Sequence, residues 1–195
     1  MIVGDRNLFA IESSITEALP SLGQRALGYF VIHILGKIYG VREPNASLLA
    51  CSFDEVCARL ARRGTHKVSY LSDIDAHLIV EAYLDAIYRN TARNDYCQRT
   101  RSEFSDDLYD VGAPWAPDGD EAFDDGSIIL QFDVGDKVRL IAFQSEDWSV
   151  ETAHSVEDIW IDGHLFYGVL SEWSTLFAAQ WAERVRDAKP EGRSI

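Results

Sequence analysis

Two pairs of apolar, β-branched segments, each joined by a short turn, constrain the fold of this chain most. Residues 128–133 and 137–143 are separated only by Val134-Gly135-Asp136, and residues 28–34 and 37–41 only by Leu35-Gly36. Antiparallel strands can be joined by turns of this length, whereas parallel strands need a long crossover connection. The sequence therefore predicts antiparallel hairpins. The run from Tyr29 to Leu35 is apolar on both faces except at His33, so we expect this strand to be covered on both sides, and the strand at 137–143 to be largely covered as well.

Three main helices are predicted around the hairpins. Ser52 and Glu55 fit a capping box for a helix that ends near Gly64, with Arg59, Arg62 and Arg63 in its last turns. Apolar residues at three- and four-residue steps predict further helices at residues 72–89 and, after a cap at Asp162, at 163–186. Strands at 9–15 and 158–161 and a short helix around residues 104–109 complete an α+β fold, a mainly antiparallel sheet packed against about three helices.

The length and the charge of the chain restrict its organisation and its partners. Its 195 residues suit a single domain, residues 1–195, that ends in a flexible tail at 187–195. The formal net charge is -14, and nucleic acids and anionic membranes are bound by cationic surfaces. We therefore expect no direct binding to nucleic acid and no binding to a membrane; a basic protein or a cationic ligand remains as a partner. The sequence specifies no oligomeric state.

No motif for catalysis, a cofactor or a metal is found in the sequence. The five histidines are scattered without metal-binding spacing, and His33, inside a predicted strand, is expected to be a buried residue with its polar atoms satisfied. The sequence contains no glycine-rich phosphate loop and no nucleophile elbow. The three cysteines are expected to be free, and neither a signal peptide nor a membrane span is recognisable. These features predict a cytoplasmic protein with no catalytic residue and no cofactor.

The most concentrated polar feature is residues 102–126, which contain nine acidic residues and no lysine or arginine. This stretch could be a metal site, a solvated acidic loop, or a contact surface for a basic protein. Trp115 lies among these acids, and aromatic anchors surrounded by charge are typical of tight interfaces. For the third interpretation, the candidate contact residues are Asp106, Asp107, Asp110, Trp115, Asp118, Asp120, Glu121, Asp124 and Asp125.

The metal interpretation gives the alternative function, a metal-dependent hydrolase or phosphoesterase that uses the Asp118–Asp125 carboxylates. Clustered carboxylates of this kind bind Ca²⁺ or Mg²⁺. However, an EF-hand loop that begins at Asp118 would need glycine at its sixth position, where this chain has Phe123. The acidic stretch therefore does not match that loop, and we assign no metal ligand.

Several longer blocks resemble one known family. They are Gly4–Glu12, Gly28–Phe30, Gly36–Val41, Ala46–Val56 with Arg62–His66, Trp115–Ser127, Leu130–Asp133 and Val138–Phe143. Together they look like the immunity protein 42 family of bacterial polymorphic-toxin and contact-dependent growth inhibition systems. The resemblance extends over about residues 2–181 and is not clear at residues 90–112.

The resemblance implies a protein that acts by binding. Such a protein stays in the cytoplasm, binds the C-terminal toxin domain delivered by a sibling cell, and blocks the active site or holds the toxin inactive. Toxins of these systems are often nucleases with cationic clefts, which an acidic inhibitor can fill in place of a phosphate backbone. The partner implied is thus the cognate toxin C-terminal domain, a basic nuclease. The resemblance supplies no catalytic residues.

Overall fold

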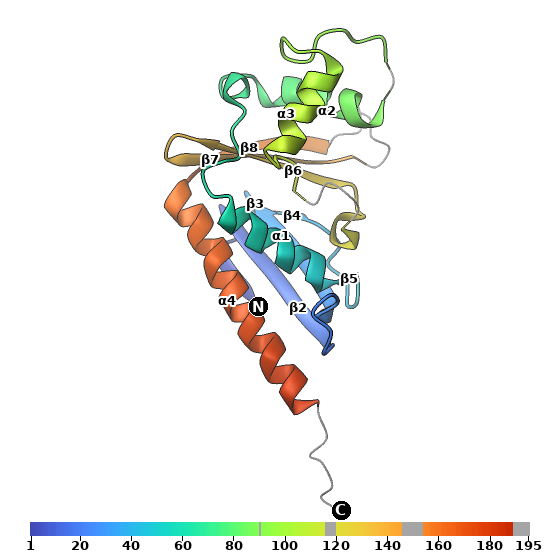
Figure 1. Ribbon diagram of the computed structural model, residues 1–195, viewed down its shortest axis with the longest axis vertical. Helices are drawn as coiled ribbons and strands as arrows, with labels where there is room; N and C mark the ends of the chain where they lie inside the picture. Colours follow the sequence, from blue (N-terminus) through green and yellow to red (C-terminus); the bar gives the residue numbers. More distant parts are fainter. Residues whose placement is uncertain (90, 116–119, 146–153, 189–195) are drawn as a thin grey trace, which may run out of the picture.

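The computed structural model describes residues 1–89, 91–115, 120–145 and 154–188. It has an α+β fold with antiparallel sheets (Figure 1), which confirms the predicted fold class. The predicted strands do not form one sheet, however, but divide between two. Sheet A has the strand order β1-β2-β3-β4, and β5 also pairs with β3. Its strands are β1 (Ile2–Asp5), β2 (Phe9–Ala18), β3 (Ala26–Ile34), β4 (Lys37–Tyr39) and β5 (Ser47–Leu48).

Sheet B has the order β6-β7-β8, and the helices lie on both sides of it. In Figure 1, α2 and α3 cover its upper side, while α1, α4 and sheet A lie below it. The elements are β6 (Ser127–Val134), β7 (Lys137–Gln144), β8 (His154–Asp162), α1 (Leu49–Ala61), α2 (Ala76–Tyr88), α3 (Arg101–Asp110) and α4 (Gly163–Asp187), with short 3₁₀ helices η1 (Ser69–Leu71) and η2 (Glu121–Phe123).

Both predicted hairpins are confirmed. In the first, Leu35 and Gly36 connect β3 to β4, and both residues have positive φ angles, 51° and 80°. Two successive positive φ values are characteristic of the type I′ turn, which matches the twist of the strands it joins. In the second, Val134 pairs with Lys137 across the turn between β6 and β7.

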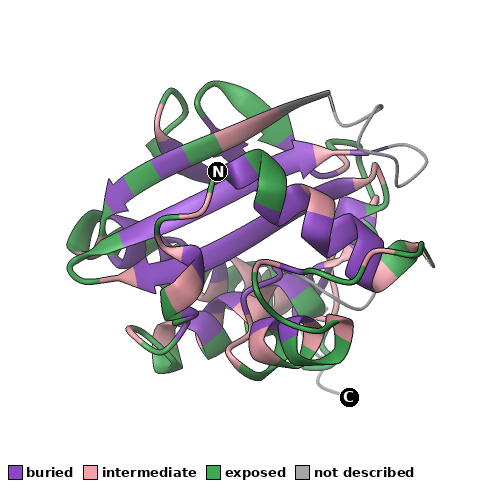
Figure 2. Cartoon of the chain, turned by 90° about the horizontal axis from the view of Figure 1, so that it is seen from above, coloured by how far each residue is buried: buried purple, intermediate pink, exposed green. Residues whose placement is uncertain are grey.

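Sheet B separates two hydrophobic cores, so its strands are apolar on both faces. From β7, Val138, Leu140 and Ala142 belong to the core shared with sheet A and α4, whereas Ile141 and Phe143 belong to the core under α2 and α3. Side chains alternate between the faces of a strand, which explains this division. Figure 2 shows the buried residues running along the strands, with exposed residues on turns and outer helix faces. The expectation of strands covered on both sides is therefore correct for β7.

The predicted start of α1 is wrong. The helix begins at Leu49, directly after β5, and Leu48 at the N-cap position contributes no side-chain hydrogen bond. Ser52 lies inside the helix, where its hydroxyl donates to Asp120 Oδ2 at 3.0 Å. Glu55, the other residue of the expected capping box, lies 2.7 Å from the guanidinium of Arg59. Both side chains of the expected box thus make other contacts.

The remaining helices agree with the sequence except at their ends. Helix α2 starts at Ala76, capped by Asp75, because residues 72–74, expected in its first turn, instead form a turn that follows η1. Asp162 caps α4 as predicted, accepting from the Leu165 amide at 3.0 Å. Asp187 still belongs to α4, and residues 189–195 of the expected tail lie outside the described residues. Among the helices of the described part, none has the length and apolarity required to cross a membrane.

Two buried arginines join the layers. Arg139 of β7 donates to both carboxylate oxygens of Asp158 and to the carbonyl groups of Leu71 and Ile74, so it fixes the segment before α2 on sheet B. Arg59 of α1 is 1% exposed. Arg59 lies in the last turn of α1, as expected, but its side chain points into the core. Since a guanidinium carries several donors in a rigid fork, each arginine satisfies several acceptors at once.

Candidate functional site

The nine candidate contact residues do not form one cluster. Asp106, Asp107 and Asp110 lie on α3, which packs with α2 on sheet B. Asp120, Glu121, Asp124 and Asp125 lie on or beside η2, which contacts β3 and β5 of sheet A. Asp118 lies outside the described residues. The acidic stretch of the sequence is therefore divided between two parts of the fold.

Trp115 is buried rather than exposed among the acids. Only 4% of its surface is accessible, and the guanidinium of Arg59 lies 4.3 Å from the centre of its ring. The ring also packs edge-on against Phe166 of α4. A side chain placed in this way belongs to the core between α1, β6 and α4. The structure thus corrects the expectation that Trp115 is a surface anchor.

Two of the acids beside η2 have structural partners. The carboxylate of Asp120 caps η2 by accepting from the Ala122 amide at 3.0 Å, and it also accepts the hydroxyl of Ser52. Burial raises the pKa of Asp120, and these hydrogen bonds oppose that effect. Asp125 accepts from the amides of Gly40 and Ser127 and from the side chain of Gln144. Both acids therefore hold this part of the chain in place.

Glu121 and Asp124 are exposed, and Glu121 lies near Cys51 of α1. Cys51, exposed on α1, reports this proximity: burial raises the pKa of its thiol, and the negative charges of Asp120, Asp54 and Glu121 raise it further. Asp54 is exposed and is 3.2 Å from Arg25. We call Asp54, Asp120, Glu121, Asp124 and Asp125 the η2 acidic surface.

The acids of α3 are arranged differently. Asp106 and Asp110 are exposed, while Asp107 lies 3.5 Å from the guanidinium of Arg99. The main-chain carbonyl of Asp110 accepts from Arg62 at 2.8 Å. Asp107 therefore has a cationic neighbour, while Asp106 and Asp110 leave two exposed carboxylates on α3.

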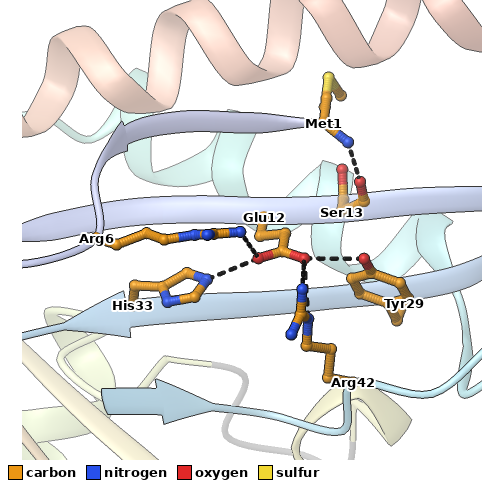
Figure 3. Close-up of polar contacts among 7 residues, drawn as sticks. All are labelled: Met1, Arg6, Glu12, Ser13, Tyr29, His33 and Arg42. Carbon is orange, nitrogen blue, oxygen red and sulfur yellow. Dashed lines mark hydrogen bonds and ion pairs between the residues drawn. The ribbon is translucent and has the colours of Figure 1, made fainter. Parts of the chain in front are cut away.

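A cluster that the sequence did not reveal lies on sheet A, centred on the carboxylate of Glu12 (Figure 3). Oε1 accepts from Arg42 Nε and Nη2 at 2.9 and 2.7 Å and from the Tyr29 hydroxyl at 2.9 Å. Oε2 accepts from Arg6 Nη2 at 2.9 Å and lies 3.0 Å from His33 Nε2. We call these five residues the Glu12 hub. His33 is 4% exposed, which confirms the prediction of a buried, satisfied histidine.

The hub is stabilised as an ion cluster. Burial by itself would raise the pKa of Glu12, but the hydrogen bonds from Arg42, Tyr29, His33 and Arg6 outweigh it and lower the pKa to about 2. Its members come from distant positions in the sequence, so spacing could not have identified it. The one local signal was a glutamate in the middle of an apolar strand, a residue type that is rarely buried without partners.

The described residues do not provide a metal centre. Among them, no group of three or more histidine, cysteine, aspartate or glutamate side chains could hold a metal ion. Asp118, part of the proposed carboxylate set, lies outside this part of the chain. The acids beside η2 instead accept hydrogen bonds from amides and hydroxyl groups, as described above, and this arrangement suits a folded turn with an exposed acidic edge.

Comparisons with known proteins give the family. The model of the immunity protein 42 family matches residues 1–176. Among solved structures, the crystal structure of CdiI from Burkholderia dolosa is similar in fold, with 18% sequence identity and a TM-score of 0.55, covering 90% of this chain and 99% of that chain. No curated protein matches the chain. Because the family match extends over nearly the whole length, the chain belongs to the immunity protein 42 family.

Proposed function

We propose that this chain is an immunity protein that binds the toxin domain of its own system and thereby neutralises it, without catalysing a reaction. The observation that carries the proposal is the match to the immunity protein 42 family over residues 1–176. The similarity in fold to a protein titled CdiI agrees with a role in contact-dependent growth inhibition. The same proposal places the protein in the cytoplasm, where an incoming toxin domain would act.

We further propose that the toxin domain is a basic nuclease and that the η2 acidic surface blocks its active site. The net charge of -14 and the exposed carboxylates of Glu121 and Asp124 support this assignment. Nucleases bind the phosphate backbone with lysine and arginine, so an acidic surface can compete for the same cleft. Opposite charges would also accelerate association, up to about 10⁸–10⁹ M⁻¹s⁻¹ at low salt.

A growth-protection assay tests the immunity function. The cognate toxin domain is expressed in a sensitive strain with and without this chain, and survival is counted. We expect survival only when the chain is present. Death of the cells in both cases, with the chain verified as soluble and folded, would refute the proposed function.

The role of the acidic surface is tested with Glu121→Lys/Asp124→Lys. These two side chains are exposed, whereas reversing Asp120 or Asp125 would break the hydrogen bonds that hold η2. Loss of charge pairs across an interface is expected to reduce the association rate by about 10-fold or more at low salt, with a smaller effect at high salt. The matched control is Glu172→Lys/Glu183→Lys, two exposed acids of α4. Equal association rates for both variants would remove the η2 acidic surface from the proposal.

A further inference from the structure

The Glu12 hub lies on the face of sheet A opposite α4. Residues on the other face contact α4: Ser13 of β2 accepts a hydrogen bond from Trp173, and Phe30 of β3 packs edge-on against the same indole ring. Because neighbouring residues of a strand point to opposite faces, Glu12 and Tyr29 point away from α4. On that side, the polar side chains of the hub bond to the Glu12 carboxylate (Figure 3).

The hub has more positive than negative charge. Two guanidinium groups share one carboxylate, and the side chains of Arg6 and Arg42 are 48% and 47% exposed. Their bonds to Glu12 use Nη2 of Arg6 and Nε and Nη2 of Arg42, and Arg42 also interacts with the Tyr29 side chain; a guanidinium carries five N–H donors, so both arginines keep further donors for a partner. In a protein with a net charge of -14, these two arginines form an exposed cationic site.

The arginines are also fixed in position. A free arginine loses much of its side-chain freedom when it binds a partner, but the hydrogen bonds to Glu12 already hold both guanidinium groups. Two exposed apolar side chains, Ile2 and Ile38, lie on the same face, since Ile2 pairs with Glu12 and Ile38 with His33 in the strand register. Arginine and tyrosine beside apolar surface are typical of residues that dominate protein interfaces.

The hub adjoins the η2 acidic surface. Arg42 follows Gly40 and Val41, and the amides of these residues donate to the Asp125 carboxylate and to the Ala122 carbonyl. A cationic site and an acidic surface therefore lie side by side. A partner that covers both must present acidic groups opposite the hub and basic groups opposite η2, a pattern more selective than a single charge.

On this basis we propose that the exposed side chains on this face of sheet A form the second half of the toxin-binding surface, and that Arg6 and Arg42 bind carboxylate side chains of an acidic segment of the toxin domain. This inference rests on the proposed function. The bidentate geometry of the guanidinium group suits a carboxylate partner, and the two exposed isoleucines supply apolar contact area around it.

Position 38 tests the sign of the partner's charge without disturbing the hub, because Ile38 makes no hydrogen bond to Glu12. Binding of the purified cognate toxin domain is measured by titration calorimetry. Ile38→Asp should weaken binding about 10-fold or more, since it brings a carboxylate next to the toxin's own acids, whereas Ile38→Lys should bind at least as tightly as a neutral Ile38→Ser variant. The reverse order, or no difference between Asp and Lys, would overturn the inference.

The arginines are tested directly with Arg6→Gln/Arg42→Gln, for which a 10- to 100-fold loss of affinity is expected. The matched control, Arg63→Gln/Arg186→Gln, removes two exposed arginines elsewhere. Thermal melting identifies any variant that has lost its fold. If the arginine double variant does not fold, the comparison of Ile38→Asp with Ile38→Lys decides whether the toxin presents acidic groups at this face. If the wild-type chain does not bind the toxin domain, the proposed function fails; if it binds and neither the hub nor position 38 matters, only this inference fails.

Discussion

Truncation of Arg59 to alanine should cost this protein a large share of its stability. The arginine is buried, donating to Gln131 Oε1 at 2.8 Å and to the Pro114 carbonyl at 2.7 Å, and stacking on Trp115. Each acceptor left unpaired in the core costs about 1–3 kcal/mol, and the lost stacking about 1–2 kcal/mol. Against this, burial of the charge lowers the pKa of Arg59 to about 10, a penalty of about 3 kcal/mol that the truncation removes.

With the cavity left by the side chain added, the net destabilisation should be about 3–5 kcal/mol, the range found when one partner of a buried ion cluster is removed. Urea denaturation followed by tryptophan fluorescence measures it. The matched control is Arg62→Ala, an exposed arginine three residues later, for which we expect less than about 1 kcal/mol. A loss below about 1 kcal/mol for Arg59→Ala would show that the buried network does not hold α1 against sheet B.

Three further predictions follow from contacts already described. The pKa of Glu12 lies at about 2 in the folded chain, below its usual 4.5, so the stabilisation from its ionised form is complete above pH 4.5 and is lost as the pH falls towards 2. Between pH 6 and pH 2.5, the free energy of unfolding measured with urea should therefore fall by about 1–2 kcal/mol less in Glu12→Gln than in the wild type. Lysine at position 139 cannot donate to Asp158 and to the Leu71 and Ile74 carbonyls together, so Arg139→Lys should lower the free energy of unfolding by about 2–3 kcal/mol. A change under about 0.5 kcal/mol would contradict the role of Arg139 in fixing this segment on sheet B. Gly28→Ala places a Cβ 1.9 Å from the Ser14 carbonyl oxygen and should destabilise the protein by more than about 2 kcal/mol. Gly168→Ala meets open space on α4 and should be neutral or stabilise the protein by up to about 1 kcal/mol, so melting temperatures in the opposite order would refute both expectations.

The sequence predicted what is decided locally. Turn residues such as Leu35 and Gly36, and caps such as Asp162, act within a few residues, so the hairpins and the last helix could be placed from pattern alone. The division of the strands between two sheets could not, because it depends on which faces meet after the chain has folded. Strand β1 was missed for the same reason, since its four residues show little pattern of their own.

The candidate site was predicted less well, and α1 shows why. Ser52 and Glu55 have the spacing of a capping box, but an earlier start at Leu49 becomes possible because β5 leads straight into the helix. Arg59 lies on the buried face of α1, one turn after Val56, and stacks on Trp115, which is buried and therefore no part of the candidate surface. The Glu12 hub combines residues from positions 6 to 42, and the pattern of one sequence does not show which of these residues meet in the folded chain.

The shared position of sheet B between two cores has a consequence for how the protein opens. Any fluctuation that lifts α2 and α3 away would expose Ile141 and Phe143, and one that separates sheet A would expose Val138 and Leu140 of the same strand. Separation of either α2 and α3 or sheet A from sheet B therefore exposes apolar side chains of β7 to water. We therefore expect the amide protons of β7 to exchange with solvent only through global unfolding, at a single free energy for the whole strand.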